Sequence, residues 1–264
     1  RRLFFRKYLL EKNGVSPDHI IMTPDNAKRN GLTSTVSFPV GNIAPEGSVI
    51  KSTAIDPSVV DPDGVYRKTG YARVFNTEKE AINSIKSQKK NLKLKAGDIM
   101  VLKCGGPMGT GMEEVYQITA ALKHLSYGKE IALITDARFS GVSTGACIGH
   151  VGPEALAGGP IGRIEEGDLI EIIIDRERLE GSINLVGDHS GNHGKTWGTK
   201  TLSERKDSES LSPHPKIPDD SRLWASLQDV SGGTWGGCVF DVDQIIKTLE
   251  AGKETLRARE KNSS

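Results

Sequence analysis

Residues 131–145 read Ile131-Ala-Leu-Ile-Thr-Asp-Ala-Arg-Phe-Ser-Gly-Val-Ser-Thr-Gly145. The apolar beginning is typical of a short buried strand, and the end is a turn rich in Gly, Ser and Thr. Ser140 stands in this turn directly before a glycine, so its hydroxyl is presented rather than packed, and the small residues around it let a ligand approach closely. Most Ser-Gly turns are only turns, so the role of Ser140 depends on the sequence around it.

Short runs of the same β type occur on both sides of this stretch, and they predict the fold class. Strands are expected at residues 48–55, 72–75, 99–102, 131–135, 169–174 and 182–186, and helices at 77–86 and 112–125. Because few helices interrupt these strands, the pattern predicts a mixed, β-rich α/β fold. We expect a barrel-like sheet flanked by helices rather than a doubly wound sheet.

Composition divides the chain into four parts. Residues 1–37 are a helix, ending at Gly14, and a polar connector, and residues 38–187 are the β-rich domain. Residues 188–218 are rich in Ser, His, Lys, Gly and Pro and are expected to be a linker, and residues 219–264 are a C-terminal extension of two helices. The first helix is already under way at residue 1 without an initiator Met, so we expect a C-terminal part of a longer polypeptide.

The composition excludes several functional classes. The net charge is +1 with 26% charged residues, which gives no bulk electrostatic basis for binding nucleic acid or an anionic membrane. No apolar run approaches the roughly 20 residues that cross a bilayer. The three cysteines are odd in number and widely spaced, so they predict no disulfide framework and a reducing compartment. Together these features predict a cytoplasmic protein.

A second glycine-rich turn, Gly105-Gly-Pro-Met-Gly-Thr-Gly111, lies between a predicted strand and a predicted helix. It lacks the Gly-Lys-Ser/Thr ending of a P-loop and the spacing of the dinucleotide fingerprint. Thr110 and Glu113 fit a capping box at the start of the helix, which accounts for Glu113. Glu114 projects in another direction and is either a functional residue or an acid that stabilises the helix dipole.

Polar residues surround Ser140 in its own turn. Asp136 is expected to make a local turn contact or ion pair, whereas Arg138 is suited to bind a substrate carboxylate. Ser143 and Thr144 are placed to hydrogen-bond either a polyol or the loop backbone. The chain has no Gly-x-Ser-x-Gly elbow and no HExxH, so neither a hydrolase triad nor a histidine metal site is supported.

Four blocks of sequence then occur in a characteristic order: Asn42-Ile-Ala-Pro-Glu-Gly47, Gly106-Pro-x-Gly-x-Gly-Met-x-Glu114, Leu133-Ile-Thr-Asp-x-Arg-Phe-Ser-Gly141 and Gly149-His-Val-x-Pro-Glu-Ala155. Together they resemble the C-terminal half of the iron–sulfur dehydratases of dihydroxy acids and sugar acids. The tail, with Leu223-Trp-Ala and Ser231-Gly-Gly-Thr-Trp235, is similar to the sugar-acid subgroup, most closely to the D-xylonate dehydratases.

The resemblance implies a fold, an activity and site residues. It implies a swivelling β/β/α barrel-like domain of a hydro-lyase that converts a 2,3-dihydroxy acid, through an enol, to the 2-keto-3-deoxy acid. By resemblance, Ser140 is the catalytic base at C2 and Glu114 is a Mg²⁺ ligand. The residue types of Arg138, Ser143 and Thr144 make these three the expected substrate-binding residues.

The resemblance also implies partners that this chain does not supply. An N-terminal cluster-binding domain would hold the iron–sulfur cluster and most of the Mg²⁺ ligands, and the full-length enzyme is expected to be a homo-oligomer. None of the three cysteines falls in a motif for a cluster ligand, and one glutamate does not hold a hydrated Mg²⁺ tightly. We therefore expect this chain alone to bind neither cofactor and to be inactive.

Three alternatives remain open at this point. The central blocks are shared with dihydroxy-acid and 6-phosphogluconate dehydratases, and the expected fold is shared with the swivelling domain of aconitase-type enzymes. The chain would also suit a non-catalytic module that docks onto a partner. The Arg-Phe-Ser-Gly block and the Gly-Met-x-Glu spacing favour a dehydratase, and the tail and residues 38–57 favour a sugar acid, with D-xylonate as the expected substrate.

Overall fold

The computed structural model describes residues 2–16, 20, 22–31, 35–87, 89, 93–140, 145–236 and 239–262. The chain forms two compact units, residues 1–35 and 36–264. The first unit contains α1 (Arg2–Asn13), which confirms the expected first helix, and the short helix α3 (Pro24–Arg29). Helix α3 was not expected from the polar composition of this part. It begins because the Thr23 hydroxyl accepts the Asn26 amide, at 3.3 Å, ahead of a proline suited to the first helical turn.

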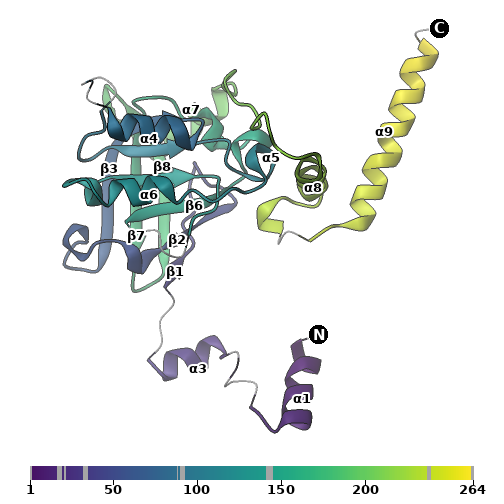
Figure 1. Cartoon of the computed structure of the whole chain (residues 1–264), viewed down its shortest axis with the longest axis horizontal. Helices are drawn as coiled ribbons and strands as arrows, with labels where there is room; N and C mark the ends of the chain where they lie inside the picture. The colour runs from purple at the N-terminus through teal and green to yellow at the C-terminus, as the bar shows by residue number, and fades with distance from the viewer. Residues whose placement is uncertain are drawn as a thin grey trace. The chain divides into compact units, whose positions relative to one another are not determined.

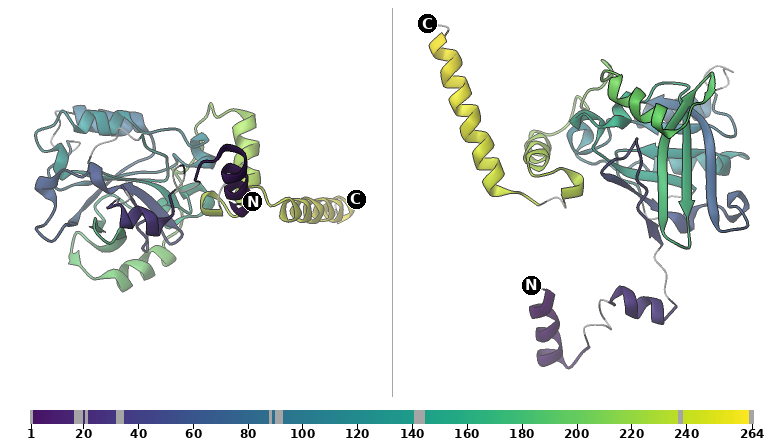
Figure 2. Two further views of the ribbon diagram at one scale, coloured as in Figure 1. Left: turned by 90° about the horizontal axis from the view of Figure 1, so that it is seen from below. Right: turned by 180° about the vertical axis from the view of Figure 1, so that it is seen from behind.

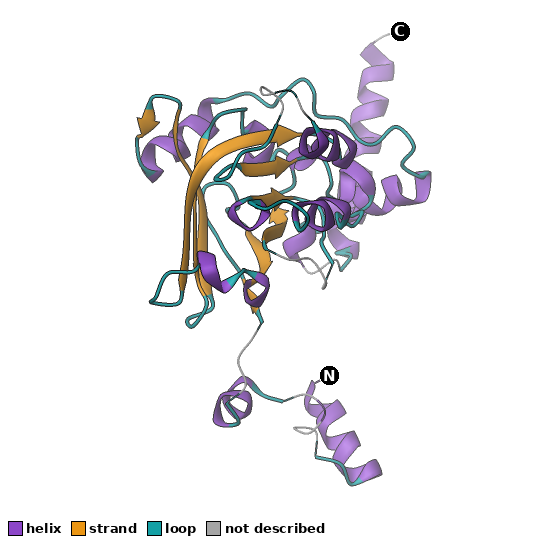
Figure 3. Ribbon diagram, turned by 60° about the vertical axis from the view of Figure 1, so that its left-hand side comes forward, coloured by secondary structure: helices purple, strands orange, loops and turns teal. Residues whose placement is uncertain are grey.

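The second unit is built on one mixed sheet. In the part of the chain that the structure describes, nine strands pair in the order β1-β2-β6-β5-β4-β3-β7-β8-β9 (Figure 1). The strands are β1 (Val36–Ser37), β2 (Gly47–Lys51), β3 (Val65–Phe75), β4 (Ile99–Leu102), β5 (Ala132–Thr135), β6 (Ala146–Gly152), β7 (Leu169–Asp175), β8 (Glu180–Asp188) and β9 (Gly191–Asn192). The pairs among β3, β4, β5 and β6 are parallel and the others are antiparallel. The long strands curve around the core, as Figure 3 shows, which confirms the expected β-rich mixed fold.

The central strands are apolar on both faces because both faces are covered. In β4, Val101 points to the core inside the curved sheet, while Met100 belongs to the cluster on the other face. Strand β5 repeats this alternation with Ile134 and Leu133. Helices α4 (Glu78–Lys86) and α6 (Gln117–Leu122) pack side by side over the second cluster. The continuous apolar runs of β4 and β5 are thus the sequence signature of buried parallel strands.

The outer strands alternate instead. In β7, Ile170, Ile172 and Ile174 are fully buried in the inner core, and the intervening residues are only half-buried. The register with β3, from Val65 opposite Asp175, keeps these isoleucines on one face over the whole strand. The period of two in this part of the sequence therefore marks a sheet with one solvated face.

The range 188–218, expected to be a linker, packs against the sheet. It contains β9 and helix α7 (Lys195–Glu204), which contacts β8 and lies on the opposite side of the sheet from α4 (Figure 2). After α7, the Arg205 guanidinium donates two hydrogen bonds to the buried Asp168 carboxylate, at 2.6 and 2.9 Å. The buried Leu202 and this two-hydrogen-bond ion pair anchor the segment. The sequence did not indicate a helix here because the segment has too few apolar positions.

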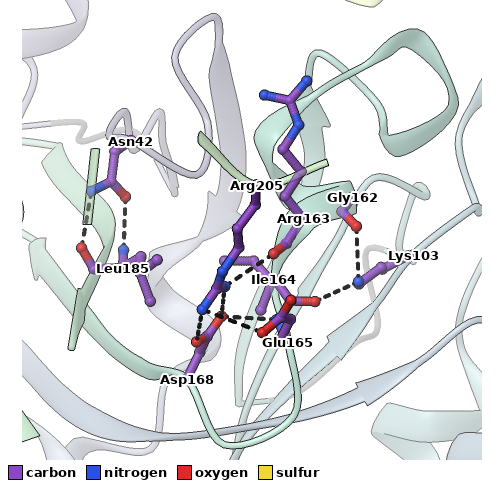
Figure 4. Close-up of polar contacts among 9 residues, drawn as sticks. All are labelled: Asn42, Lys103, Gly162, Arg163, Ile164, Glu165, Asp168, Leu185 and Arg205. Atoms are coloured by element: carbon purple, nitrogen blue, oxygen red, sulfur yellow. Dashed lines mark hydrogen bonds and ion pairs between the residues drawn. The ribbon is translucent and has the colours of Figure 1, made fainter. Parts of the chain in front are cut away.

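Two further polar contacts, drawn in Figure 4, join segments that are far apart in the sequence. The Asn42 side chain accepts the Leu185 amide, at 2.7 Å, and donates to the Leu185 carbonyl, at 2.9 Å. The buried Lys103 ammonium donates to the carbonyls of Gly162 and Ile164, and burial lowers the pKa of this lysine. These contacts satisfy backbone groups that the curved sheet leaves unpaired.

The helix expected at 112–125 begins later than predicted. The structure has a single turn, α5 (Pro107–Thr110), and then α6 from Gln117 to Leu122. Thr110 Oγ1 does accept the Glu113 amide, at 2.9 Å, but the Thr110 amide donates to the Gly106 carbonyl. The expected capping box is therefore wrong as a helix start. Instead, the Glu78 carboxylate of α4 accepts the amides of Gln117 and Ile118 and caps α6 from another element.

The C-terminal extension consists of α8 (Asp219–Val230), the 3₁₀ turn η6 (Thr234–Gly236) and α9 (Val242–Asn262). These elements confirm the two helices expected near 220–228 and 241–259. Helix α8 packs on α5, whereas the apolar side chains Val242, Ile246, Leu249 and Leu256 of α9 are exposed. None of the helices in the described part of the chain combines the length and the apolar character needed to cross a membrane.

Candidate functional site

The four parallel strands end at one edge of the sheet, and the sequence blocks gather there. Because β3, β4, β5 and β6 run in the same direction, the segments that follow them meet at their carboxyl ends. These segments are residues 76–78, 103–111, 136–140 and 153–155. The carboxyl edge of parallel strands is where open α/β sheets bind ligands. We call this edge the strand-end site.

A buried aspartate holds three strand ends together. Asp136, 1% exposed, accepts the Gly105 amide on one carboxylate oxygen, at 2.8 Å, and the Ala155 amide on the other, at 3.0 Å. Burial raises the pKa of Asp136, and the two amides act in the opposite direction. The expected local turn contact or ion pair is therefore corrected, because the two amides that Asp136 accepts lie 31 and 19 residues away in the sequence.

Glu154 organises the glycine-rich turn, a role that the sequence analysis missed. Both of its carboxylate oxygens accept the Met108 amide, at 2.9 and 3.1 Å, inside the turn before Glu114. A Cβ on Gly106 would overlap this carboxylate, so the turn requires glycine at that position. Burial, reinforced by the nearby Asp136, raises the pKa of Glu154 to about 8. Asp136 directly follows the strand expected at 131–135, whereas Glu154 follows β6, a strand that the sequence did not predict.

The raised pKa of Glu154 makes stability depend on pH. The pKa rises from 4.5 in the unfolded chain to about 8 in the fold, so the folded state binds the proton more tightly. This contribution to stability is complete below pH 4.5 and is lost as the pH rises through 8, by at most about 1.4 kcal/mol per pH unit. Glu154→Gln stays neutral at every pH. We expect the free energy of unfolding of this variant to increase relative to that of the unmodified protein as the pH rises from 5 to 9.

Urea denaturation at several pH values, on the full-length protein, checks this expectation. Glu180→Gln, at an exposed position on β8, is the matched control and should follow the unmodified protein at each pH. Parallel stability curves for Glu154→Gln and the unmodified protein over pH 5 to 9 would show that Glu154 does not hold its proton in the fold.

The backbone brings Glu114 beside the turn that carries Ser140. Glu114 forms an isolated parallel bridge with Arg138, and the Val115 amide donates to the Arg138 carbonyl, at 3.0 Å. Ser140 lies two residues beyond this bridge and is half-buried, as is Glu114. The expectation of a helical Glu114 is thus corrected: an extended pairing, not a helix face, sets its position. The pairing puts a carboxylate and a serine hydroxyl on neighbouring segments.

The expected substrate-binding residues fall partly within the described structure. Arg138 is exposed at the strand-end site. Burial of His150 lowers the pKa of its ring, and the positive charge of Arg138 lowers it further. Ser143 and Thr144 lie outside the described residues. Of the three residues expected to bind the substrate, the structure therefore describes Arg138, whose side chain is open to solvent.

A cleft opens beside Glu114 along the ends of β3 and β4. Its lining residues come from the ends of these strands, the glycine-rich turn and the segment 212–215, and they include Asn76, Cys104, Thr110, Glu114 and His214. Ser140 and Arg138 are not among them. Glu114 is thus accessible from this cleft.

The described residues fit one ligand of a Mg²⁺ site but not a cluster site. In the described ranges, no three His, Cys, Asp or Glu side chains converge as a metal site would require. Glu114 supplies the hard carboxylate oxygen that Mg²⁺ prefers, as a single ligand. Cys104 and Cys147 are both buried, and burial raises the pKa of Cys104 to about 11 and that of Cys147 to about 12. An iron–sulfur cluster takes several converging cysteine ligands. Cys238 lies outside the described residues.

The histidine pair at 189 and 193 is separated by its contacts. The His189 ring stacks on Tyr71, with ring centroids 5.5 Å apart. His193 Nε2 instead lies 2.9 Å from Ser190 Oγ and 3.3 Å from an Asp188 oxygen. These two rings therefore do not converge on one ion.

The chain is similar in sequence to known proteins. The profile of the family described as dihydroxy-acid/6-phosphogluconate dehydratase C-terminal matches residues 20–214. The D-xylonate dehydratases YagF and YjhG of Escherichia coli K12 are 58% and 59% identical to the chain, over 97% and 94% of its length. A dihydroxy-acid dehydratase of Lachnospira eligens is 44% identical over 61% of the chain. The chain spans 38% of the length of each D-xylonate dehydratase and 27% of the dihydroxy-acid dehydratase.

Proposed function

The chain belongs to the dihydroxy-acid/6-phosphogluconate dehydratase family, and we propose that it is the C-terminal part of a hydro-lyase that acts on a sugar acid. One observation supports this most strongly: the likeness to two D-xylonate dehydratases runs through nearly the whole chain, whereas the likeness to the dihydroxy-acid dehydratase stops at 61%. The proposed substrate is D-xylonate, and the product is its 2-keto-3-deoxy acid.

In this proposal Ser140 is the base. Its Oγ takes the proton from C2, the electron pair of the C–H bond forms the C2–C3 double bond, and the C3 hydroxyl leaves as water after protonation. The resulting enol tautomerises to the keto acid. A serine hydroxyl needs positive charge nearby to act in this way, because its alkoxide is a strong base. Arg138, two residues before Ser140, supplies one such charge, and its guanidinium is also suited to the substrate carboxylate.

Glu114 is proposed as one of the ligands of Mg²⁺. A bound Mg²⁺ would stabilise negative charge on the substrate and on the serine oxygen. The extended bridge to Arg138 holds the Glu114 backbone beside the Ser140 turn, which supports a joint role for the proposed metal ligand and the proposed base. The other ligands, and all those of an iron–sulfur cluster, are proposed to come from the rest of the full-length enzyme, because the described cysteines do not suit a cluster.

A substrate panel tests the proposed function. The full-length enzyme, loaded with iron and Mg²⁺, is expected to dehydrate D-xylonate with a kcat/KM at least about 100-fold above that for 2,3-dihydroxyisovalerate, since hydroxyl-reading sites discriminate strongly. Other five- and six-carbon aldonic acids and 6-phosphogluconate complete the panel. Product formation is followed as the 2-keto acid. Equal turnover of 2,3-dihydroxyisovalerate and D-xylonate would contradict the sugar-acid assignment.

A further inference from the structure

Trp235, in the C-terminal extension, occupies a slot built by two glycines. A Cβ on Gly152, at the end of β6, would overlap the indole ring, and a Cβ on Gly47, at the start of β2, would lie 3.0–3.2 Å from it. The Phe38 ring meets the indole edge-on, with centroids 6.3 Å apart. Strands β2 and β6 pair at Gly47 and Gly152, so the indole lies across the end of this pair. The slot therefore fixes the ring by shape.

The indole also makes a directed contact with the strand-end site. Its Nε1 donates to the His150 carbonyl, at 3.0 Å. His150 has a φ of 54°, in the left-handed region that residues other than glycine rarely adopt. Such a conformation persists only where neighbouring contacts hold it. The Trp235 hydrogen bond is one contact of this kind, on the carbonyl of the strained residue.

His150 in turn holds the segment before Ser140. Its amide donates to the Ala137 carbonyl, at 2.9 Å. Its ring meets the Phe139 ring edge-on, with centroids 6.1 Å apart. The Phe139 ring covers Gly149, where a Cβ would overlap it. Residues 149–150 of β6 thus contact the chain at positions 137 and 139, which lie on either side of Arg138 and directly before Ser140.

We propose that Trp235 is a positioning residue for Ser140, acting through His150 and Phe139. This inference rests on the proposed function of Ser140 as the base. The extension that carries Trp235 lies beyond the family match at residues 20–214, yet the two D-xylonate dehydratases align with 94–97% of the chain. The extension is therefore a shared feature of this subgroup, and its tryptophan braces the turn that presents the reactive hydroxyl.

A purely structural role accounts less well for Trp235. The indole is half-buried and belongs to neither of the two core clusters among the described residues. Its Nε1 hydrogen bond goes to the backbone of the strained His150 rather than to a neighbour in its own extension. Removing the indole should consequently disturb the geometry at residues 137–140 more than the stability of the sheet.

Two variants of the full-length enzyme separate the ring from its N–H donor. Trp235→Phe keeps an aromatic ring in the slot without the donor, and Trp235→Ala empties the slot. Leu223→Ala, at an exposed position on α8 in the same extension, is the matched control. We expect kcat to fall about 10-fold in the Phe variant and about 100-fold in the Ala variant, with KM and metal content unchanged, since small displacements of reacting groups have effects of this size.

Hydrogen–deuterium exchange provides a readout that does not depend on turnover. Peptides covering residues 136–140 and 146–152 should exchange faster in Trp235→Ala, whereas peptides from β7 and β8 should not. If the Ala variant does not fold, the Phe variant decides by the same two measurements. Unchanged kcat together with unchanged exchange at 136–140 would overturn the inference. An enzyme that dehydrates no sugar acid but shows the exchange effect would contradict the proposed function and leave the bracing by Trp235 standing.

Discussion

Ser140→Ala in the full-length enzyme is expected to lower kcat for D-xylonate by about 1,000-fold, the range over which a positioned general base contributes. The substitution removes one oxygen at a half-buried position on a loop and leaves the bridge between Glu114 and Arg138 intact. KM, iron content and Mg²⁺ content should therefore stay at the values of the unmodified enzyme. Steady-state kinetics and metal analysis of the same preparation check both parts.

The control for this variant is a serine with no place at the strand-end site. Ser203 is exposed on α7, where its hydroxyl donates to the Lys200 carbonyl, at 2.7 Å. Ser203→Ala should leave kcat and KM unchanged. A Ser140→Ala enzyme that kept a tenth or more of the normal kcat would rule out Ser140 as the base.

Glu114→Gln is expected to have the second largest effect. The amide keeps the size of the side chain but loses the negative charge that binds a divalent cation. We expect the Mg²⁺ concentration for half-maximal activity to rise at least about 100-fold and kcat at saturating Mg²⁺ to fall at least about 10-fold. Titration of the metal-stripped enzyme with Mg²⁺, followed by activity, measures both quantities.

The neighbouring Glu113 offers a matched control. It is exposed, and the hydrogen bond from its backbone amide to Thr110 Oγ1 survives a change of side chain. Glu113→Gln should consequently show the Mg²⁺ dependence of the unmodified enzyme. Equal effects of the two substitutions would mean that negative charge near the turn, rather than ligation by Glu114, accounts for the result.

The strands that the sequence predicted correctly are those whose faces are set by burial. The run Ile99–Leu102 is apolar throughout because both faces of β4 are covered, and Ile170, Ile172 and Ile174 alternate because one face of β7 is not. Strand β6 was missed. Its sequence, Ala146-Cys-Ile-Gly-His-Val-Gly152, contains two glycines that weaken the β signal, and those glycines are where Phe139 and Trp235 approach.

The site was predictable as a set of residues but not as an arrangement. Ser140 and Glu114 each stand out in a turn, yet their proximity depends on the bridge between Glu114 and Arg138, which are 24 positions apart in the sequence. The same bridge delays the start of α6. The role of Asp136 was mispredicted and that of Glu154 was missed for a similar reason, because a buried acid that accepts distant amides has the same local sequence as an acid in a solvated turn.

Exchange of the C2 proton reports the base itself, because it does not require loss of water. Full-length enzyme with its metals bound is incubated with D-xylonate in D₂O, and NMR measures deuterium at C2 in the substrate that remains and formation of the product, whose C2 is a carbonyl carbon. We predict that the unmodified enzyme releases the C2 proton and that Ser140→Ala, with the same metal content and bound substrate, does not. Release of the C2 proton by Ser140→Ala at the rate of the unmodified enzyme would contradict the account.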